Sequence, residues 1–354
     1  MRPTGVLMVG SVPGESKEEV FMRFATALPG RLQAIPDGEV GERGNYVLWQ
    51  MQRFPDLARR IELGGTPLSE SGSDLPTFTL EDIAPTGYDE AAISSYVEFQ
   101  RLRQQKVIPP NVRFQIGLPS PYNVLTTHVK TELLDAVEPL YERRFAETID
   151  HIVASIPHDD MVIQWDLALE IMTLEANRGR EVHDQYKPFF RTGGDLEGLV
   201  DRVARLCGRI PMDVPLAFHL CYGDAQQTHF VEPVDTSLLV ELANALLARP
   251  TLGPRTRWIH LPVPKNRTDL DYFTPLNNLK LDDFGSTPPY VYLGLVHAND
   301  EAGTKKRIET AQASVPFPFG VSTECGLGRT SPEEVDGILH LCKEVTGCHT
   351  QGEI

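Results

Sequence analysis

The sequence lacks any apolar run that approaches the roughly 20 residues of a membrane-spanning helix, and its N-terminus lacks the charged-then-apolar layout of a signal peptide. It also lacks a block of Lys and Arg, and the 354 residues carry a formal charge of −16. Nucleic acids and anionic membrane surfaces are therefore poor candidate partners. Internal repeats and low-complexity tracts are missing as well, which argues against a repeat architecture.

Cysteine is scarce in this chain. The five cysteines are odd in number and unevenly spaced, at positions 207, 221, 325, 342 and 348. In a chain of this size that pattern argues against a disulfide framework. We therefore expect a reducing compartment such as the cytoplasm.

The apolar residues that are present, 41% of the chain, support a full core and fall into eight strand-like runs at 5–10, 32–36, 112–118, 161–166, 214–221, 257–261, 290–296 and 317–321. Helical patterns separate most of these runs, at 17–28, 133–156, 196–206, 236–247 and 331–345. Eight strands that alternate with helices predict a single (β/α)8 TIM barrel over residues 1–354. A stretch rich in Gly, Ser, Pro and Thr around 64–85 predicts an insertion at the rim, as a lid or as a plain surface loop.

The fifth run ends in His219 and Cys221. Residues two apart on a strand project to the same face, so an imidazole and a thiol lie side by side. Zinc accepts nitrogen and sulfur ligands of these kinds. The eighth run leads into Cys325, and strand ends of a parallel barrel share one rim. His219, Cys221 and Cys325 can then meet at one ion, although a core histidine with two inert buried thiols is the alternative.

These two stretches, His-Leu-Cys-Tyr-Gly-Asp at 219–224 and Glu-Cys-Gly-Leu-Gly-Arg at 324–329, resemble the zinc motifs of cobalamin-independent methionine synthase. Further matches follow in the same order from about residue 5 to about residue 345. By this resemblance the chain is identified as a member of the uroporphyrinogen decarboxylase and methionine synthase-like superfamily. It matches the C-terminal catalytic barrel, without the N-terminal half of that family. The resemblance implies Zn²⁺ as cofactor and transfer of a methyl or alkyl group to a thiol such as homocysteine.

The resemblance also assigns roles to other residues at strand ends. Gly10 and Ser11 match the Gly-Ser that holds the carboxylate of the substrate amino acid, and Glu39 and Asp166 match residues that contact its amino group. Each has an alternative explanation from the residues alone: an ordinary strand-to-helix turn, a solvated loop carboxylate, and a helix cap. The chain departs from the family after Asp166, where a Glu-Pro pair is missing.

Two further histidines occupy family positions. His260 stands where the family has a glutamate that completes the zinc shell, so it is either a fourth ligand or a hydrogen-bonded core residue. His297 stands where the family has a histidine that acts as acid or base, which implies a catalytic role. A polar rim residue that caps the helix beginning near Asp300 is the alternative for His297.

The predicted partners are thus a small-molecule thiol acceptor and an alkyl donor. Two other functions compete with this hypothesis. One is a metal-free lyase that resembles uroporphyrinogen decarboxylase and acts on an anionic substrate, although such chemistry does not need paired cysteines. The other is a barrel retained as a non-catalytic binding module, which the missing Glu-Pro pair leaves open.

Overall fold

Eight apolar segments form the strands of the computed structural model, which describes residues 2–60, 76–182, 194–223, 229–281, 284 and 287–349. Their burial on both faces is typical of parallel strands covered by helices. The strands are β1 (Val6–Leu7), β2 (Ala34–Pro36), β3 (Arg113–Pro119), β4 (Met161–Leu167), β5 (Leu216–Leu220), β6 (Thr256–Pro262), β7 (Tyr290–Val296) and β8 (Phe319–Thr323).

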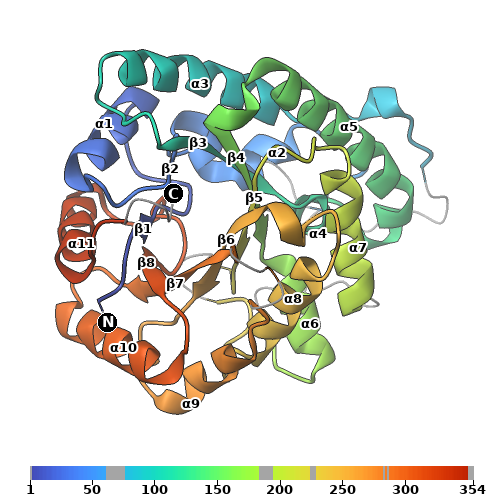
Figure 1. Cartoon of the computed structure of the whole chain (residues 1–354). Coiled ribbons are helices and arrows are strands. Elements are labelled where there is room, and N and C mark those ends of the chain that lie inside the picture. The colour runs from blue at the N-terminus through green and yellow to red at the C-terminus, as the bar shows by residue number, and fades with distance from the viewer. Residues whose placement is uncertain are drawn as a thin grey trace.

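All eight strands are parallel and neighbours follow in the order β1-β8-β7-β6-β5-β4-β3-β2. Figure 1 shows them at the centre of the molecule with helices around them. The helices are α1 (Lys17–Ala27), α2 (Tyr46–Met51), α3 (Tyr88–Gln104), α4 (Pro121–His128), α5 (Leu134–Ser155), α6 (Leu169–Asn177), α7 (Leu196–Cys207), α8 (Ser237–Leu247), α9 (Leu270–Phe273), α10 (Glu301–Ser314) and α11 (Pro332–Val345). The predicted (β/α)8 barrel is confirmed.

Among the described residues no strand ladder joins β1 to β2. A backbone hydrogen bond from the Val6 N–H to the Arg31 carbonyl oxygen and buried amide side chains connect the barrel at this place. Gln115 on β3 and Gln164 on β4 donate to the carbonyl oxygen of Val9, at 2.7 and 2.8 Å. Gln164 also accepts a hydrogen bond from the indole of Trp258 on β6. These bonds hold the segment after β1 against the strands on the far side of the interior.

The structure describes only part of the insertion predicted around 64–85. The predicted insertion lies outside the described residues over 64–75. Residues 76–85 contain a short 3-10 helix, Leu80–Asp82, and Arg144 of α5 donates to the carbonyl oxygens of Leu80 and Ile83. That part of the segment therefore lies on the outer helix layer. Helices α2, α3, α4, α6 and α9 were absent from the expected helices. The longest of them, α3, packs beside α1 and α5.

The described helices include none with the combined length and apolar character needed to cross a bilayer. This agrees with the lack of long apolar runs in the sequence.

The interior amides lead to a stability prediction. Gln164→Leu leaves the indole N–H of Trp258 and part of the Val9 carbonyl's bonding capacity unsatisfied in a dry interior. We expect the free energy of unfolding to fall by about 1–3 kcal/mol, measured by urea denaturation. Gln104→Leu, at an exposed position at the end of α3, is the control and should shift it by less than about 0.5 kcal/mol. Equal stabilities for the two variants would contradict the bridging role.

Candidate metal centre and substrate pocket

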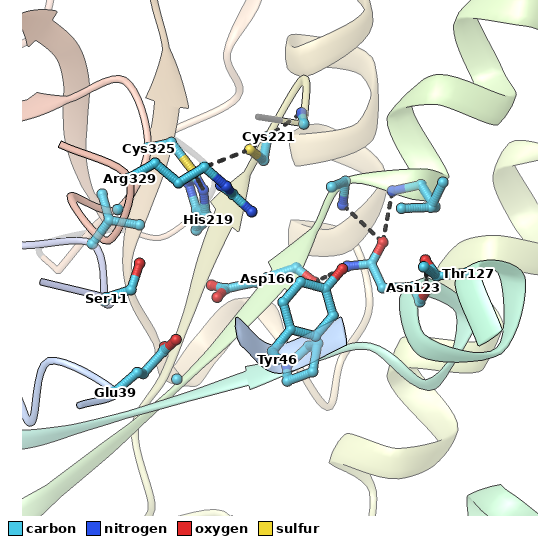
Figure 2. A pocket seen from close by; sticks show the side chains of 18 of the residues that line it. Ser11, Glu39, Tyr46, Asn123, Thr127, Asp166, His219, Cys221, Cys325 and Arg329 are labelled. Atoms are coloured by element: carbon cyan, nitrogen blue, oxygen red, sulfur yellow. Dashed lines mark hydrogen bonds between the residues drawn. The ribbon is translucent and has the colours of Figure 1, made fainter. Parts of the chain in front are cut away.

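The carboxyl ends of β5 and β8 bring the three predicted metal ligands together. His219 lies on β5, Cys221 directly follows its last residue, and Cys325 lies two residues beyond β8. His219 and Cys221 are buried, and Cys325 is partly buried. One ligand atom from each lies within 4.8 Å of the other two. Figure 2 shows the three side chains grouped at one side of a pocket.

The spacing of these atoms suits a tetrahedral zinc ion. The sulfurs of Cys221 and Cys325 are 3.6 Å apart, and Nε2 of His219 is 3.7 Å from the Cys325 sulfur. Bonds of about 2.3 Å to sulfur and about 2.0 Å to nitrogen, at tetrahedral angles, place such pairs about 3.5–3.8 Å apart. The residues therefore fit a zinc ion in both ligand type and separation.

Local turns hold the two sulfurs in place. Gly223 adopts a left-handed conformation, with φ +79°, and its N–H donates to the Cys221 sulfur over 3.3 Å. The turn after Cys325 is fastened to Ser11: the N–H of Leu327 donates to the Ser11 carbonyl oxygen, and that of Gly328 to its Oγ. Ser11 thus ties the end of β1 to the metal-ligand loop.

His260, expected as a fourth ligand or a core residue, lies behind His219. Its Nδ1 is 2.7 Å from Nδ1 of His219, and its Nε2 is 3.0 Å from the carbonyl oxygen of Thr323. Burial lowers the pKa of His260 to about 3 and holds that of His219 well below its usual range. Both nitrogens of His260 are therefore used by protein groups, and it lies outside the group of three.

The pocket in front of the metal-ligand group has a volume of about 290 Å³, near the lower end of the range for small-molecule sites. Gly10, Ser11, Glu39 and Asp166 all line it together with the three ligands. The structure thus brings the four predicted substrate contacts and the metal ligands into one cavity. Aromatic and aliphatic side chains form the remaining wall, among them Tyr46, Trp49, Tyr88, Met172 and Phe230.

Glu39 and Asp166 form a pair of carboxyl groups in this pocket, and both lie close to Gly117. Burial raises the pKa of Glu39 to about 7, although Arg43 and Arg329 oppose the change. Burial, and secondly the charge of Glu39, raises the pKa of Asp166 well above its usual range. Glu39 is also held at φ 52°, a strained conformation that is common at functional sites. A cation placed between the two carboxyls would relieve their repulsion.

The loop that presents Glu39 is fixed by a buried ion pair. Arg43 donates to the carboxylate of Asp37 at 2.6 Å, and Asp37 also accepts from Ser95 and from the Glu39 N–H. Burial alone would raise the pKa of Asp37, but Arg43 and these hydrogen bonds lower it. The sequence did not identify Arg43, because only the structure shows that its charge serves Asp37.

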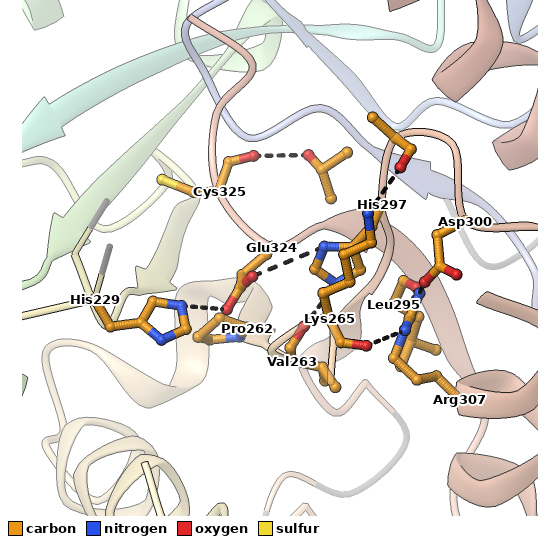
Figure 3. Close-up of polar contacts among 12 residues, drawn as sticks. His229, Pro262, Val263, Lys265, Leu295, His297, Asp300, Arg307, Glu324 and Cys325 are labelled. Carbon is orange, nitrogen blue, oxygen red and sulfur yellow. Dashed lines mark hydrogen bonds and ion pairs between the residues drawn. The ribbon is translucent and has the colours of Figure 1, made fainter. Parts of the chain in front are cut away.

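His297 does not join the four substrate contacts. It lines a second cavity of about 450 Å³ that shares Cys221 and Cys325 with the first. Its Nε2 lies 2.9 Å from the carbonyl oxygen of Val263, and its Nδ1 is 3.9 Å from a carboxylate oxygen of Glu324 (Figure 3). Burial lowers the pKa of His297, and Glu324 opposes the change.

Two residues of this second cavity were not predicted. Glu324 accepts from Nε2 of His229 at 2.8 Å. Burial opposes protonation of His229, but Glu324 and Glu232 outweigh it and raise its pKa to about 9. Glu324 could have been found because it immediately precedes Cys325. His229 lies between β5 and α8, away from any strand end, and belongs to neither of the two motifs described above.

The fold and the site together define a (β/α)8 barrel with a candidate metal centre at its mouth. Comparison with protein-family models gives no match, and comparison with curated proteins gives none either. Among solved structures, a B12-independent methionine synthase from Shewanella sp. W3-18-1, in complex with selenomethionine, is similar over 97% of this chain and 96% of that one. The TM-score is 0.55 at 14% sequence identity, which shows a shared fold.

A second solved structure, the old yellow enzyme from Trypanosoma cruzi, has a TM-score of 0.39 at 13% identity over 89% of this chain and 84% of that one. That likeness is too weak to support an argument. The resemblance to methionine synthase that the motifs predicted is confirmed at the level of the fold.

The raised pKa of Glu39 gives a pH prediction. The unfolded side chain loses its proton near pH 4.5 and the folded one near pH 7, so stability that depends on the neutral form is lost as pH rises through this range. Glu39→Gln should therefore match the wild-type free energy of unfolding near pH 4.5 and exceed it progressively up to about pH 7. Urea titrations across this range measure the difference, with Glu42→Gln in the same loop as control. A constant difference would contradict the burial argument.

Proposed function

We propose that this chain is a zinc-dependent transferase that moves a methyl or another small alkyl group to the sulfur of an amino-acid thiol such as homocysteine. The observation that carries the proposal is the shared cavity. A metal-competent His-Cys-Cys group and a pair of carboxyl groups line the same pocket of about 290 Å³. An amino-acid thiol has a sulfur that would bind the metal and an ammonium group that would pair with the carboxyl groups.

His219, Cys221 and Cys325 would hold the zinc ion. Two thiolates offset the charge of the ion. When bound, zinc would deprotonate a thiol that joined it and so supply a thiolate near neutral pH. The Gly223 N–H that donates to the Cys221 sulfur favours the thiolate form of this ligand.

The acceptor would be oriented by the opposite side of the pocket. Its ammonium group would lie between Glu39 and Asp166, which become ionised when a cation is present. Its carboxylate would contact Gly10 and Ser11. Because the Ser11 Oγ accepts from the Gly328 N–H, its own proton remains free for the substrate. The methionine synthase of similar fold was solved with selenomethionine, an amino acid that carries a methyl group on selenium, which agrees with this class of ligand.

His297 would act as the acid–base group from the second cavity. Its Nε2 proton is held by the Val263 carbonyl, so Nδ1 is the atom that can exchange a proton with a reactant. Glu324 lies beside Nδ1 and would stabilise the protonated ring. The buried Arg307 donates to the carbonyl oxygens of Leu295 and Lys265, which fixes the chain around this histidine.

A lyase for an anionic substrate is less well supported by the pocket. Two adjacent carboxyl groups offer an anion no positive charge, and of the two arginines that line the cavity, Arg43 and Arg329, Arg43 is paired with Asp37. An assay of alkyl transfer distinguishes an enzyme from a non-catalytic binding barrel. The test is alkylation of homocysteine and other small thiols by a panel of methyl donors, with product detected by mass spectrometry. Zinc-loaded protein that transfers no alkyl group from any donor would count against the transferase.

Zinc content is the first prediction from this proposal. Protein purified without chelator should contain about one zinc per chain, measured by elemental analysis. Cys221→Ser should lose most of it, because a hydroxyl is a poor zinc ligand. Cys342→Ser, which changes a buried cysteine of α11 outside the metal-ligand group, is the matched control and should keep its zinc. Active wild-type protein without metal would rule out the proposal.

The role of His297 gives a separate prediction. Glutamine can keep the hydrogen bond to Val263 but cannot exchange a proton near neutral pH. His297→Gln should therefore retain zinc and substrate affinity, while turnover falls by roughly 10²–10⁴-fold. His151→Gln, on the exposed side of α5, is the control. Unchanged turnover would end the assignment, and a loss of zinc together with activity would make His297 a ligand instead.

A further inference from the structure

His260 and His219 form a cross-strand pair directly behind the metal-ligand group. They are register partners on β6 and β5. Both are buried, with relative exposures of 0% and 3%, and their ring centroids are 4.7 Å apart. The two Nδ1 atoms are 2.7 Å apart, a distance that requires one ring to donate and the other to accept.

The Thr323 carbonyl oxygen, which is hydrogen-bonded to His260, determines which nitrogen of each ring carries the proton. The Thr323 carbonyl can only accept, so Nε2 of His260 carries the proton that bonds to it at 3.0 Å. A neutral imidazole carries a single proton, so Nδ1 of His260 has none and accepts. Nδ1 of His219 therefore donates. Nε2 of His219 then carries no proton and has a lone pair for a metal ion. This atom lies 3.7 Å from the Cys325 sulfur.

We propose that His260 is a positioning residue that fixes the tautomer and the ring orientation of His219 for metal binding through Nε2, and that it is not itself a ligand. The inference deepens the proposed function, because it concerns the metal centre on which that function rests. It gives the ion three protein ligands and leaves room for a substrate thiol. Where the family that the chain resembles has a glutamate, this chain would then have a neutral imidazole that both donates and accepts a hydrogen bond.

Thr323 links the same chain of contacts to the second sulfur. Its carbonyl oxygen accepts from His260, and its Oγ1 donates to the carbonyl oxygen of Cys325 at 2.7 Å. One residue at the end of β8 therefore anchors both His260 and the turn that presents Cys325. A change at His260 should then disturb the imidazole ligand, and to a lesser extent the sulfur ligand, without removing either.

The tautomers can be read directly in metal-free protein by ¹⁵N–¹H correlation NMR of ¹⁵N-histidine-labelled chain. We expect His219 to carry its proton on Nδ1 and His260 on Nε2, with assignments from His219→Phe and His260→Phe. In His260→Phe the His219 ring should lose this single fixed tautomer. A proton on Nε2 of His219 in the wild type would overturn the proposal. This result does not depend on any transferase activity.

Zinc affinity supplies the second arm, by competition with a chromophoric chelator. His260→Phe should bind zinc about 10–100-fold more weakly, the usual effect of losing a group that orients a metal-bound histidine. Arg257→Gln, at an exposed position on the same strand, is the control and should keep wild-type affinity. His260→Leu, which also lacks a hydrogen-bonding group, provides a second variant if the phenylalanine variant does not fold. Unchanged affinity in a folded His260 variant would contradict the positioning role.

X-ray absorption at the zinc edge distinguishes positioning from ligation. Wild-type protein should show one imidazole and two sulfur ligands, and His260→Phe should show the same set. Two imidazoles in the wild type, falling to one in the variant, would overturn the inference. The proposed transferase function can fail in the alkylation assay while these ligand numbers and tautomers hold, so the two failures are distinguishable.

Discussion

The parallel register of the barrel is the constraint on which the site depends. Because every strand runs in the same direction, the carboxyl ends of β5, β6 and β8 lie on one rim. His219 and Cys325 are 106 residues apart in sequence, yet their ligand atoms are 3.7 Å apart. A shift of one residue in the pairing of β5 with β6 would turn His219 away from the interior and remove His260 from its side.

The contacts that close the barrel also orient the pocket. Gln164 donates both to the Val9 carbonyl and to the Asp166 carboxyl group, so the amide that bridges the interior also orients a candidate substrate contact. Ser11 lines the same cavity as Glu39 and Asp166, and it is hydrogen-bonded to the turn that follows Cys325. Hydrogen bonds therefore connect the candidate metal-ligand group to the end of β1 and the pocket carboxyls to the barrel interior.

The sequence predicted much of this arrangement because its signals are local. All eight strands were expected within a few residues of their positions, since each is a short buried apolar run. The metal-ligand group was predicted from the two-residue spacing of His219 and Cys221 and from the barrel rule that places Cys325 on the same rim. Helix α3 was missed although Tyr88, Ala92, Tyr96 and Phe99 recur at helical spacing. The hydrogen bonds of His260 and the His229–Glu324 pair depend on side-chain directions across strands and loops, which spacing along one chain does not give.

The central claim is that His219, Cys221 and Cys325 hold one zinc ion at the mouth of the barrel. Anomalous diffraction from crystals of the protein, recorded on both sides of the zinc absorption edge, tests it most directly. The account predicts a single strong peak between Nε2 of His219 and the two sulfurs, with His260 still bonded to Thr323. A peak at another place, or no peak in protein that transfers an alkyl group, would contradict it.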